Sequence, residues 1–234
     1  GVGPVVINGE TVLAIVPARG GSKRLPRKNV LPLHGKPLIV WTIEAGLRSN
    51  YIDKLIVSSE DSEILDIARN SSVETIKRPS QLAKDDTSTF DAVEHALNTI
   101  QPSFDILVLL QPTSPLRNET HIDQALNLMM NKKANAIVSV SAAEHPPPWT
   151  NTLPDDNNME SFLENNISNV RSQDLPEFFR INGALYICRT KHFLDEKSFF
   201  LKNNIFAYRM SRSASIDIDV ELDLKLAKLI KSNA

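Results

Sequence analysis

Cysteine is almost missing from this chain of 234 residues, in which Cys188 is the single one. No intramolecular disulfide can form, as is typical of proteins from a reducing compartment. Long apolar runs are missing too, since none approaches the ~18 residues that a membrane-spanning helix needs. The N-terminus has no basic segment followed by an apolar one, which is the mark of a signal peptide. The sequence therefore predicts a cytoplasmic protein with no membrane partner.

A surplus of either charge is also missing. The chain has 26 basic and 28 acidic residues, a formal net charge of −2 and a pI near 6.2. Proteins that bind nucleic acid usually carry a basic surplus, so we expect no nucleic-acid partner. The composition, 41% apolar and 23% charged, is that of a globular protein that can bury a core. The length fits one large domain or two small ones.

Positive charge is nevertheless concentrated in one place, the stretch "AIVPARGGSKRLPRKN" at 14–29. A short apolar run ends there in a loop with paired glycines, and no carboxylate lies between Glu10 and Glu44. Glycines let backbone N–H groups approach an anion closely. A solvated basic loop is the alternative. We interpret the loop as a phosphate-binding site, although it matches neither the Walker A nor the G-x-G-x-x-G pattern. Its five cations are Arg19, Lys23, Arg24, Arg27 and Lys28.

Strand and helix patterns alternate along most of the chain. Apolar or β-branched runs predict strands at 11–17, 54–59, 73–78, 105–110, 135–140 and 183–190. Apolar residues at helical spacing predict helices at 37–49, 61–70, 86–100 and 118–130. This alternation predicts an α/β fold with a mainly parallel sheet and helices on both faces. Ligands of such sheets bind at the carboxyl ends of the strands, where the basic loop lies.

Two segments depart from this alternation. Residues 1–10 resemble a flexible lead-in, and residues 144–176 are rich in Pro, Asn and Asp, which predicts an excursion from the core. Near the C-terminus, alternating apolar residues predict a short strand that ends near Asp217, followed by a helix from about residue 220.

Two further groups of polar residues are candidate sites. Gln111, Thr113 and Ser114 follow a buried strand in "LLQPTSPLR", which is equally typical of a structural turn. Asp217 and Asp219, in "SIDIDVELD", would point the same way from a strand and could hold one Mg²⁺. Alternatively, Asp219 is a helix N-cap and Asp217 a surface residue. The five histidines show no metal-binding spacing, and no serine lies in a G-x-S-x-G elbow.

Taken together, the motifs resemble those of the acylneuraminate cytidylyltransferases, the CMP-sialic acid synthetases. The resemblance runs from about residue 12 to the C-terminus, with the pieces in family order: "IVPARGGSKRLPRKN", "KRPSQLA", "LLQPTSPLR", "FRINGALYI" and "SIDIDVELD". It implies a three-layer α/β/α nucleotidyltransferase fold, Rossmann-like, over residues 11–234. It also implies a homodimer, with residues 141–181 as a dimerisation excursion.

The resemblance further implies an activity and its residues. The family transfers CMP from CTP to the anomeric hydroxyl of a nine-carbon acidic keto-sugar, an N-acylneuraminate, with Mg²⁺. Nucleotide-binding positions match Arg19, Gly20, Ser22, Lys28, Asn29 and Arg78. Sugar-binding positions match Gln111, Arg171, Asn182, Tyr186, Phe199 and Phe200, although the family often has two adjacent arginines where this chain has Arg171 and Ser172. The residues implied in catalysis are Arg19 and Lys28, which would stabilise the departing pyrophosphate, and the metal ligands Asp217 and Asp219.

Other activities stay open on the sequence alone. The same reaction could use legionaminate, pseudaminate or Kdo as the sugar. A glycosyltransferase with a D-x-D motif is a second class, but such motifs normally lie mid-chain, and Asp217-Ile218-Asp219 lies close to the C-terminus. A non-catalytic nucleotide sensor is a third class, which the presence of both the basic loop and the aspartate pair disfavours.

Overall fold

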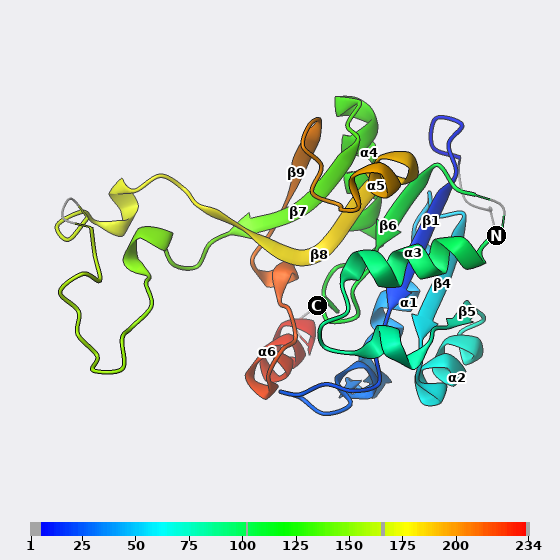
Figure 1. The fold of residues 1–234 in the computed structure, drawn as a ribbon, viewed down its shortest axis with the longest axis horizontal. Helices are drawn as coiled ribbons and strands as arrows, with labels where there is room; N and C mark the ends of the chain where they lie inside the picture. Colours follow the sequence, from blue (N-terminus) through cyan, green and yellow to red (C-terminus); the bar gives the residue numbers. More distant parts are fainter. Residues whose placement is uncertain (1–5, 102, 165–166, 233–234) are drawn as a thin grey trace.

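The computed structural model describes residues 6–101, 103–164 and 167–232, so residues 1–5 of the predicted lead-in and 165–166 of the predicted excursion lie outside the described residues. A seven-stranded sheet with the order β5-β4-β1-β6-β8-β7-β9 forms the centre (Figure 1). Strand β8 is antiparallel to its two neighbours, β6 and β7. All other neighbouring strands of this sheet are parallel. The mainly parallel α/β sheet is thus confirmed. The strands are β1 (Val12–Pro17), β4 (Lys54–Ser59), β5 (Glu74–Lys77), β6 (Ile106–Leu109), β7 (Ala136–Ala142), β8 (Phe179–Arg189) and β9 (Ile205–Met210).

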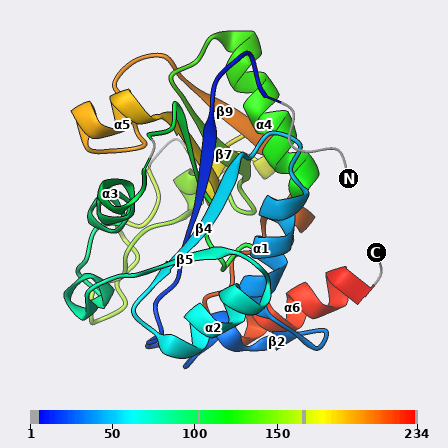
Figure 2. The ribbon, with the colours of Figure 1, turned by 90° about the vertical axis from the view of Figure 1, so that its right-hand side faces the viewer.

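Helices cover both faces of the sheet, because the central strands are apolar on both sides (Figure 2). Val12, Ala14 and Val16 of β1 face one core, which contains residues of α1 (Leu38–Arg48), α2 (Ser62–Asn70) and α4 (Glu119–Lys132). Leu13 and Ile15 face the other core, which contains residues of α3 (Thr89–Thr99) and α5 (Thr190–Glu196). The three-layer arrangement implied by the resemblance is therefore present.

A third, smaller core lies beside the basic loop. It joins the hairpin of β2 (Pro32–Leu33) and β3 (Lys36–Pro37) to the C-terminal helix α6 (Glu221–Ser232). Leu33, Ile218 and Leu224 are buried in it. This core attaches the aspartate pair of the C-terminal segment to the rest of the domain.

The sequence-based elements are largely confirmed. Helix α5, strand β9 and the short hairpin of β2 and β3 were not predicted. No strand is present at 211–220, so the predicted strand that ends near Asp217 is wrong. Ile218 is buried because it packs in the third core, and that packing produces the apolar alternation. The helix predicted from about residue 220 is confirmed as α6.

The prediction of a loose lead-in is wrong for its last residues. Ile7 is buried in the main core and forms a bridge with Glu10. Asn8 and Gly9 both have positive φ, as a tight turn between extended residues requires. The Asn-Gly pair in the sequence was the signal for this turn.

Residues 143–164 and 167–178 form an arm that leaves the sheet between β7 and β8 (Figure 1). Its described part is irregular apart from the short turns η3 (Pro147–Trp149) and η4 (Ser172–Asp174). At its base, Arg180 donates to both carboxylate oxygens of Glu144, at 3.0 and 2.9 Å, and lowers the pKa of Glu144. Residues 141–142 and 179–181, predicted as part of the excursion, belong to β7 and β8.

Candidate functional site

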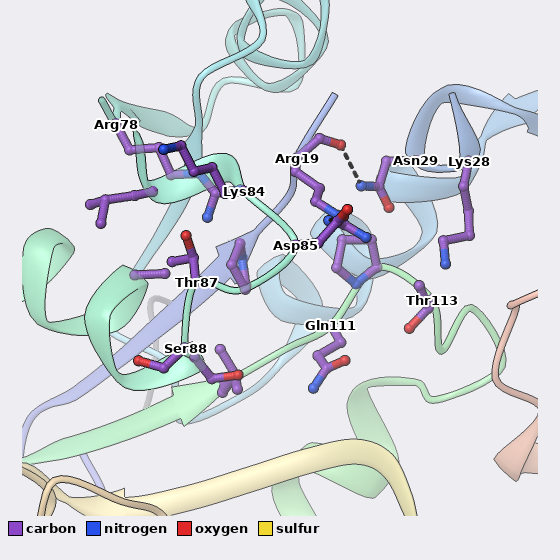
Figure 3. Close-up of a pocket in the computed structure, with 16 residues that line it drawn as sticks. Arg19, Lys28, Asn29, Arg78, Lys84, Asp85, Thr87, Ser88, Gln111 and Thr113 are labelled. Carbon is purple, nitrogen blue, oxygen red and sulfur yellow. Dashed lines mark hydrogen bonds and ion pairs between the residues drawn. The ribbon is translucent and has the colours of Figure 1, made fainter. Parts of the chain in front are cut away.

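Two cavities adjoin at the carboxyl ends of β1 and β6. The polar cavity has a volume of about 260 Å³ and is shown in Figure 3. The aromatic cavity has a volume of about 250 Å³. Four residues line both: Ser88, Thr89, Leu109 and Gln111. The remaining lining residues of the polar cavity are Pro17, Arg19, Lys28, Asn29, Arg78, Leu82, Lys84, Asp85, Thr87, Ala92, Pro112 and Thr113.

The basic loop, residues 18–30, is fixed by contacts at Gly20. A Cβ atom at Gly20 would overlap Oδ2 of Asp61 and lie 2.9 Å from Nη1 of Arg27, so a larger residue would displace the ends of these two side chains. Its backbone N–H donates to Oε1 of Glu60 at 2.5 Å. Gly21, in contrast, has open space around it. A residue larger than glycine at position 20 would therefore disturb the contact between Arg27 and Asp61.

Arg27 attaches the basic loop to the start of α2. Its guanidinium donates to Asp61 at 2.6 and 3.2 Å and also contacts Glu63. These bonds lower the pKa of Asp61 and raise that of Arg27. Asp61 is also the N-cap of α2 and accepts from the N–H of Ile64 at 3.1 Å. The side chain of Arg27 therefore holds the basic loop against α2.

The other cations of the loop differ in their partners. Lys23 is 2.8 Å from Asp85, which Arg19 also contacts, and both lower the pKa of Asp85. Arg24 is 2.6 Å from Asp219. Among the residues that the structure describes, Lys28 is the one cation of the loop with no ion pair, and it lines the polar cavity. An incoming anion would meet Lys28 directly but would have to compete with Asp85 for Arg19.

Asn29 and Arg78 present polar groups on opposite sides of the polar cavity (Figure 3). The Asn29 amide donates to the carbonyl of Arg19 at 3.0 Å, and its Oδ1 is buried without a partner in the described structure. Arg78 is buried, and its Nε donates to Oε2 of Glu60 at 3.2 Å. The unpaired acceptor suits a ligand that brings an N–H or O–H donor.

The aspartate pair lies next to the turn after β6. The N–H of Ile218 donates to the carbonyl of Thr113 at 2.8 Å, which places Asp217 and Asp219 beside that turn. Partial desolvation raises the pKa of Asp217, although a hydrogen bond with Thr113 and the charge of Lys28 oppose the rise. Asp223 accepts from the N–H groups of Asp219 and Val220, each at 2.9 Å, and so shapes the start of α6. Two adjacent carboxylates with open surface suit a cation whose other ligands come from a substrate.

The aromatic cavity is largely apolar, with several aromatic rings in its wall. The ring of Tyr186 lies 5.7 Å from that of Phe199 and 5.8 Å from that of Phe200. Lys197, at the end of α5, is the one charged side chain among its described lining residues. The full set comprises the four shared residues and Phe90, Tyr186, Phe193, Lys197, Ser198, Phe199 and Phe200.

The structure brings most of the sequence-predicted site residues to these cavities. Arg19, Lys28, Asn29 and Arg78 line the polar cavity, Tyr186, Phe199 and Phe200 the aromatic cavity, and Gln111 both. Gly20 and Ser22 lie in the same loop but do not line either cavity, and Asp217 and Asp219 lie beside the turn.

Two predicted sugar-binding residues are not brought to either cavity. The Asn182 side chain is buried behind β8, with hydrogen bonds to Ser139 at 2.6 Å and Ser215 at 3.0 Å. Arg171 is exposed on the arm. The Asn182 side chain is therefore occupied by buried hydrogen bonds, and Arg171 lies outside both cavities of its own chain.

Sequence reasoning missed several residues of the polar cavity. Lys84, Asp85, Thr87 and Ser88 lie in the segment that follows "KRPSQLA" and precedes α3. The run of small polar residues there was the available signal. Glu60, which orients Arg78, follows β4 directly, at the same edge of the sheet as the basic loop.

Proteins of known activity match most of this chain. A family model described as "Cytidylyltransferase" matches residues 13–233. The N-acylneuraminate cytidylyltransferase of Escherichia coli O18:K1:H7 is 38% identical over 94% of this chain, which spans only 52% of that protein. A pseudaminic acid cytidylyltransferase of Campylobacter jejuni is 33% identical over 93% of this chain and 95% of its own length. A CMP-N,N'-diacetyllegionaminic acid synthase of Legionella pneumophila is 34% identical over 95% of this chain and 97% of its own length.

Solved structures share the fold at low sequence identity. A CMP:2-keto-3-deoxy-manno-octonic acid synthetase in complex with CTP has a TM-score of 0.71 and 17% identity, and the match covers 95% of this chain and 99% of that one. A 4-diphosphocytidyl-2C-methyl-D-erythritol synthase of Anaerococcus prevotii has a TM-score of 0.68 and 14% identity, and the match covers 96% of this chain and 99% of that one. The nucleotidyltransferase-like α/β fold is thereby confirmed. Within the described residues, no helix is both long and apolar enough to cross a membrane.

Proposed function

This chain belongs to the cytidylyltransferase family, and we propose that it transfers CMP from CTP to the anomeric hydroxyl of an N-acylneuraminate, releasing pyrophosphate. The observation that carries the proposal is the junction of the two cavities at Gln111. A cation-lined cavity suits the nucleotide, and an aromatic cavity suits the sugar with its acyl substituent. Two substrates placed end to end would meet where the cavities share their lining.

Transfer of this kind depends on positioning and charge neutralisation rather than on a protein nucleophile. The hydroxyl oxygen attacks the α-phosphorus, the bond to the β-phosphate oxygen breaks, and pyrophosphate leaves in line. Lys28 and Arg19 would hold the triphosphate and stabilise the charge that develops on the leaving group. The hydroxyl proton is released to water in the same step.

A divalent cation is part of the proposal. Asp217 and Asp219 suit such a role because burial, with smaller contributions from the charges of Asp219 and Asp223, raises the pKa of Asp217, and a bound cation would favour its charged form. No group of three or more His, Cys, Asp or Glu side chains at metal-binding distance occurs among the described residues. Magnesium is commonly held by one or two carboxylates plus substrate phosphates, so this pair suits it. When bound, Mg²⁺ would polarise the phosphate and lower the pKa of the attacking hydroxyl.

The proposal extends to assembly and location. The arm carries exposed apolar side chains, among them Trp149, Leu153 and Met159. Exposed apolar residues on a segment that leaves the body favour an interface, and we expect a homodimer formed through the arm. Such a dimer could bring Arg171 of one arm toward the other subunit's cavities. The reaction fits a cytoplasmic enzyme, because CTP is a cytoplasmic metabolite.

The test is release of pyrophosphate from CTP in the presence of Mg²⁺ and a sugar. N-acetylneuraminate, legionaminate, pseudaminate and Kdo should be compared at limiting concentrations by kcat/KM. We expect release that depends on the sugar, with the highest kcat/KM for the neuraminate. Preference for legionaminate or pseudaminate would retain the reaction and replace the sugar, since relatives of both kinds match this chain. Absence of release with every sugar would reject the proposal.

A further inference from the structure

Arg117 is a buried cation that the transfer reaction does not yet use. Its side chain is 1% exposed and is the largest among the fully buried side chains of the described core. Its guanidinium donates to two carbonyls and one hydroxyl: to Gln111 O at 2.8 Å, Ala184 O at 3.0 Å and Thr42 Oγ1 at 3.3 Å. No carboxylate forms an ion pair with it in the described structure, and burial lowers its pKa to about 9, which leaves it protonated at neutral pH.

The two carbonyls belong to elements that the cavities need at a fixed separation. Gln111 is the residue that lines both cavities at the turn after β6. Ala184 lies in β8, two residues before Tyr186, which lines the aromatic cavity. The sheet pairing of β6 with β8 ends at Leu109 and Tyr186, so beyond Leu109 the sheet no longer holds the turn to β8. Arg117 restores that connection through its fork of N–H groups.

Stability alone is a poor reason for a charge in this place. A buried cation without a counter-ion is costly, and an apolar side chain of similar volume is often neutral or stabilising in such positions. The guanidinium instead offers several N–H groups in a rigid plane, which can fix two carbonyls in one geometry. Lysine, a single point donor, cannot reproduce that geometry.

We propose that Arg117 is a positioning residue, which holds Gln111 at the junction of the cavities so that the sugar hydroxyl and the α-phosphorus meet in line. The inference rests on the proposed function. Misplacing the junction should impair the transfer step more than the binding of CTP, because the loop cations proposed to hold the nucleotide lie outside the elements that Arg117 joins.

The experiment compares Arg117→Lys and Arg117→Met with the wild-type enzyme in the pyrophosphate assay. We expect kcat to fall about 10- to 100-fold in both variants, with KM for CTP changed by less than about 3-fold. Arg189→Met is the matched control. Arg189 is the last residue of β8, and its guanidinium pairs with Glu10 at 2.5 Å, away from both cavities. This variant should lower the Tm and leave kcat unchanged.

A second measurement separates positioning from folding. Arg117→Ala removes the side chain, and millimolar guanidinium ion should restore part of its kcat, whereas sodium ion at the same ionic strength should not. If the variants melt at a lower temperature yet keep the wild-type kcat per folded molecule, the inference is overturned. If Arg117→Ala fails to fold, the kcat of Arg117→Lys is sufficient for this test. A wild-type enzyme that releases no pyrophosphate would instead overturn the proposed function.

Discussion

Glu60 accepts a hydrogen bond from Nε of Arg78 at 3.2 Å while its other carboxylate oxygen accepts from the backbone N–H of Gly20 at 2.5 Å. One side chain therefore connects the basic loop with an arginine on the far side of the polar cavity. Arg78 is buried and Glu60 is half-buried, with side chains 5% and 17% exposed, respectively. Hydrogen bonds to charged groups in such surroundings are strong.

Replacing Glu60 by Gln should weaken nucleotide binding. The amide keeps the shape but loses the charge that orients Arg78, so we expect KM for CTP to rise about 3- to 10-fold with a smaller change in kcat. Steady-state kinetics at saturating sugar measure this. Glu63→Gln is the control, because Glu63 is largely exposed and contacts Arg27. An unchanged KM in Glu60→Gln would show that Arg78 needs no orientation.

Lys28 and Lys23 should behave differently although both are lysines of the basic loop. Lys28 lines the polar cavity, whereas Lys23 is 80% exposed and pairs with Asp85. A charge-assisted contact of about 1.5–3 kcal/mol predicts a loss of roughly 10- to 150-fold in kcat/KM for Lys28→Ala. Lys23→Ala should lose little, and its loss should fade with added salt. If both variants lost kcat/KM equally, and added salt removed both losses, the loop would only attract the nucleotide.

The carboxylate pair predicts a metal dependence. Asp217→Asn and Asp219→Asn should each lower kcat by about 100-fold, since a metal that polarises a phosphate is worth several kcal/mol. Asp223→Asn is the control, because an amide oxygen can still accept from the N–H groups of Asp219 and Val220. Activity measured across a Mg²⁺ titration distinguishes them. Near-normal activity in either Asp217→Asn or Asp219→Asn would remove that residue from the metal site.

The contact of Arg27 with Asp61 predicts a dependence of stability on pH. Arg27 lowers the folded-state pKa of Asp61 below its unfolded value of about 3.9, so the contact stabilises above that pH and the stabilisation is lost as the pH falls through the folded-state pKa. Asp61→Asn keeps a good N-cap and removes the charge. Because Arg27 is 41% exposed, we expect a loss of about 1 kcal/mol or less at pH 7. Urea unfolding at pH 7 and pH 3 should show that the difference shrinks in acid. A difference that grows in acid would contradict this.

The arm predicts the state of assembly. Light scattering should find a dimer, and a variant with Trp149, Leu153 and Met159 all changed to Ser should dissociate at concentrations where the wild type does not. Leu47→Ser provides the control, because Leu47 is 52% exposed on α1, in the body of the domain. A wild-type monomer with full activity would refute the assembly.

Most of the fold could be predicted from the sequence, because the central strands are continuous apolar runs and the helices carry clear apolar faces and caps. Helix α5 has seven residues and too little periodicity to recognise, and β9 is an edge strand with only two buried side chains. The basic loop was found through its charge, but the roles of its cations depend on partners distant in sequence. Lys23 and Arg24 look equivalent in the sequence, whereas Arg24 pairs with Asp219 and is unsuitable as a control. Glu60 and Arg117 could not be identified as supports, because their contacts are set by the folded sheet.

The antiparallel strand β8 also dictates the order in which this chain can fold during synthesis. Strand β7 reaches the rest of the sheet only through β8, because the order runs β6-β8-β7-β9. A nascent chain can therefore pair β1 with β4 and β6 while β7 is still unattached. Closure of the sheet has to wait until the whole arm and residue 189 have left the ribosome. A ribosome stalled within the arm would thus hold a chain with the basic loop formed, the inner edge of β6 exposed, and no aromatic cavity.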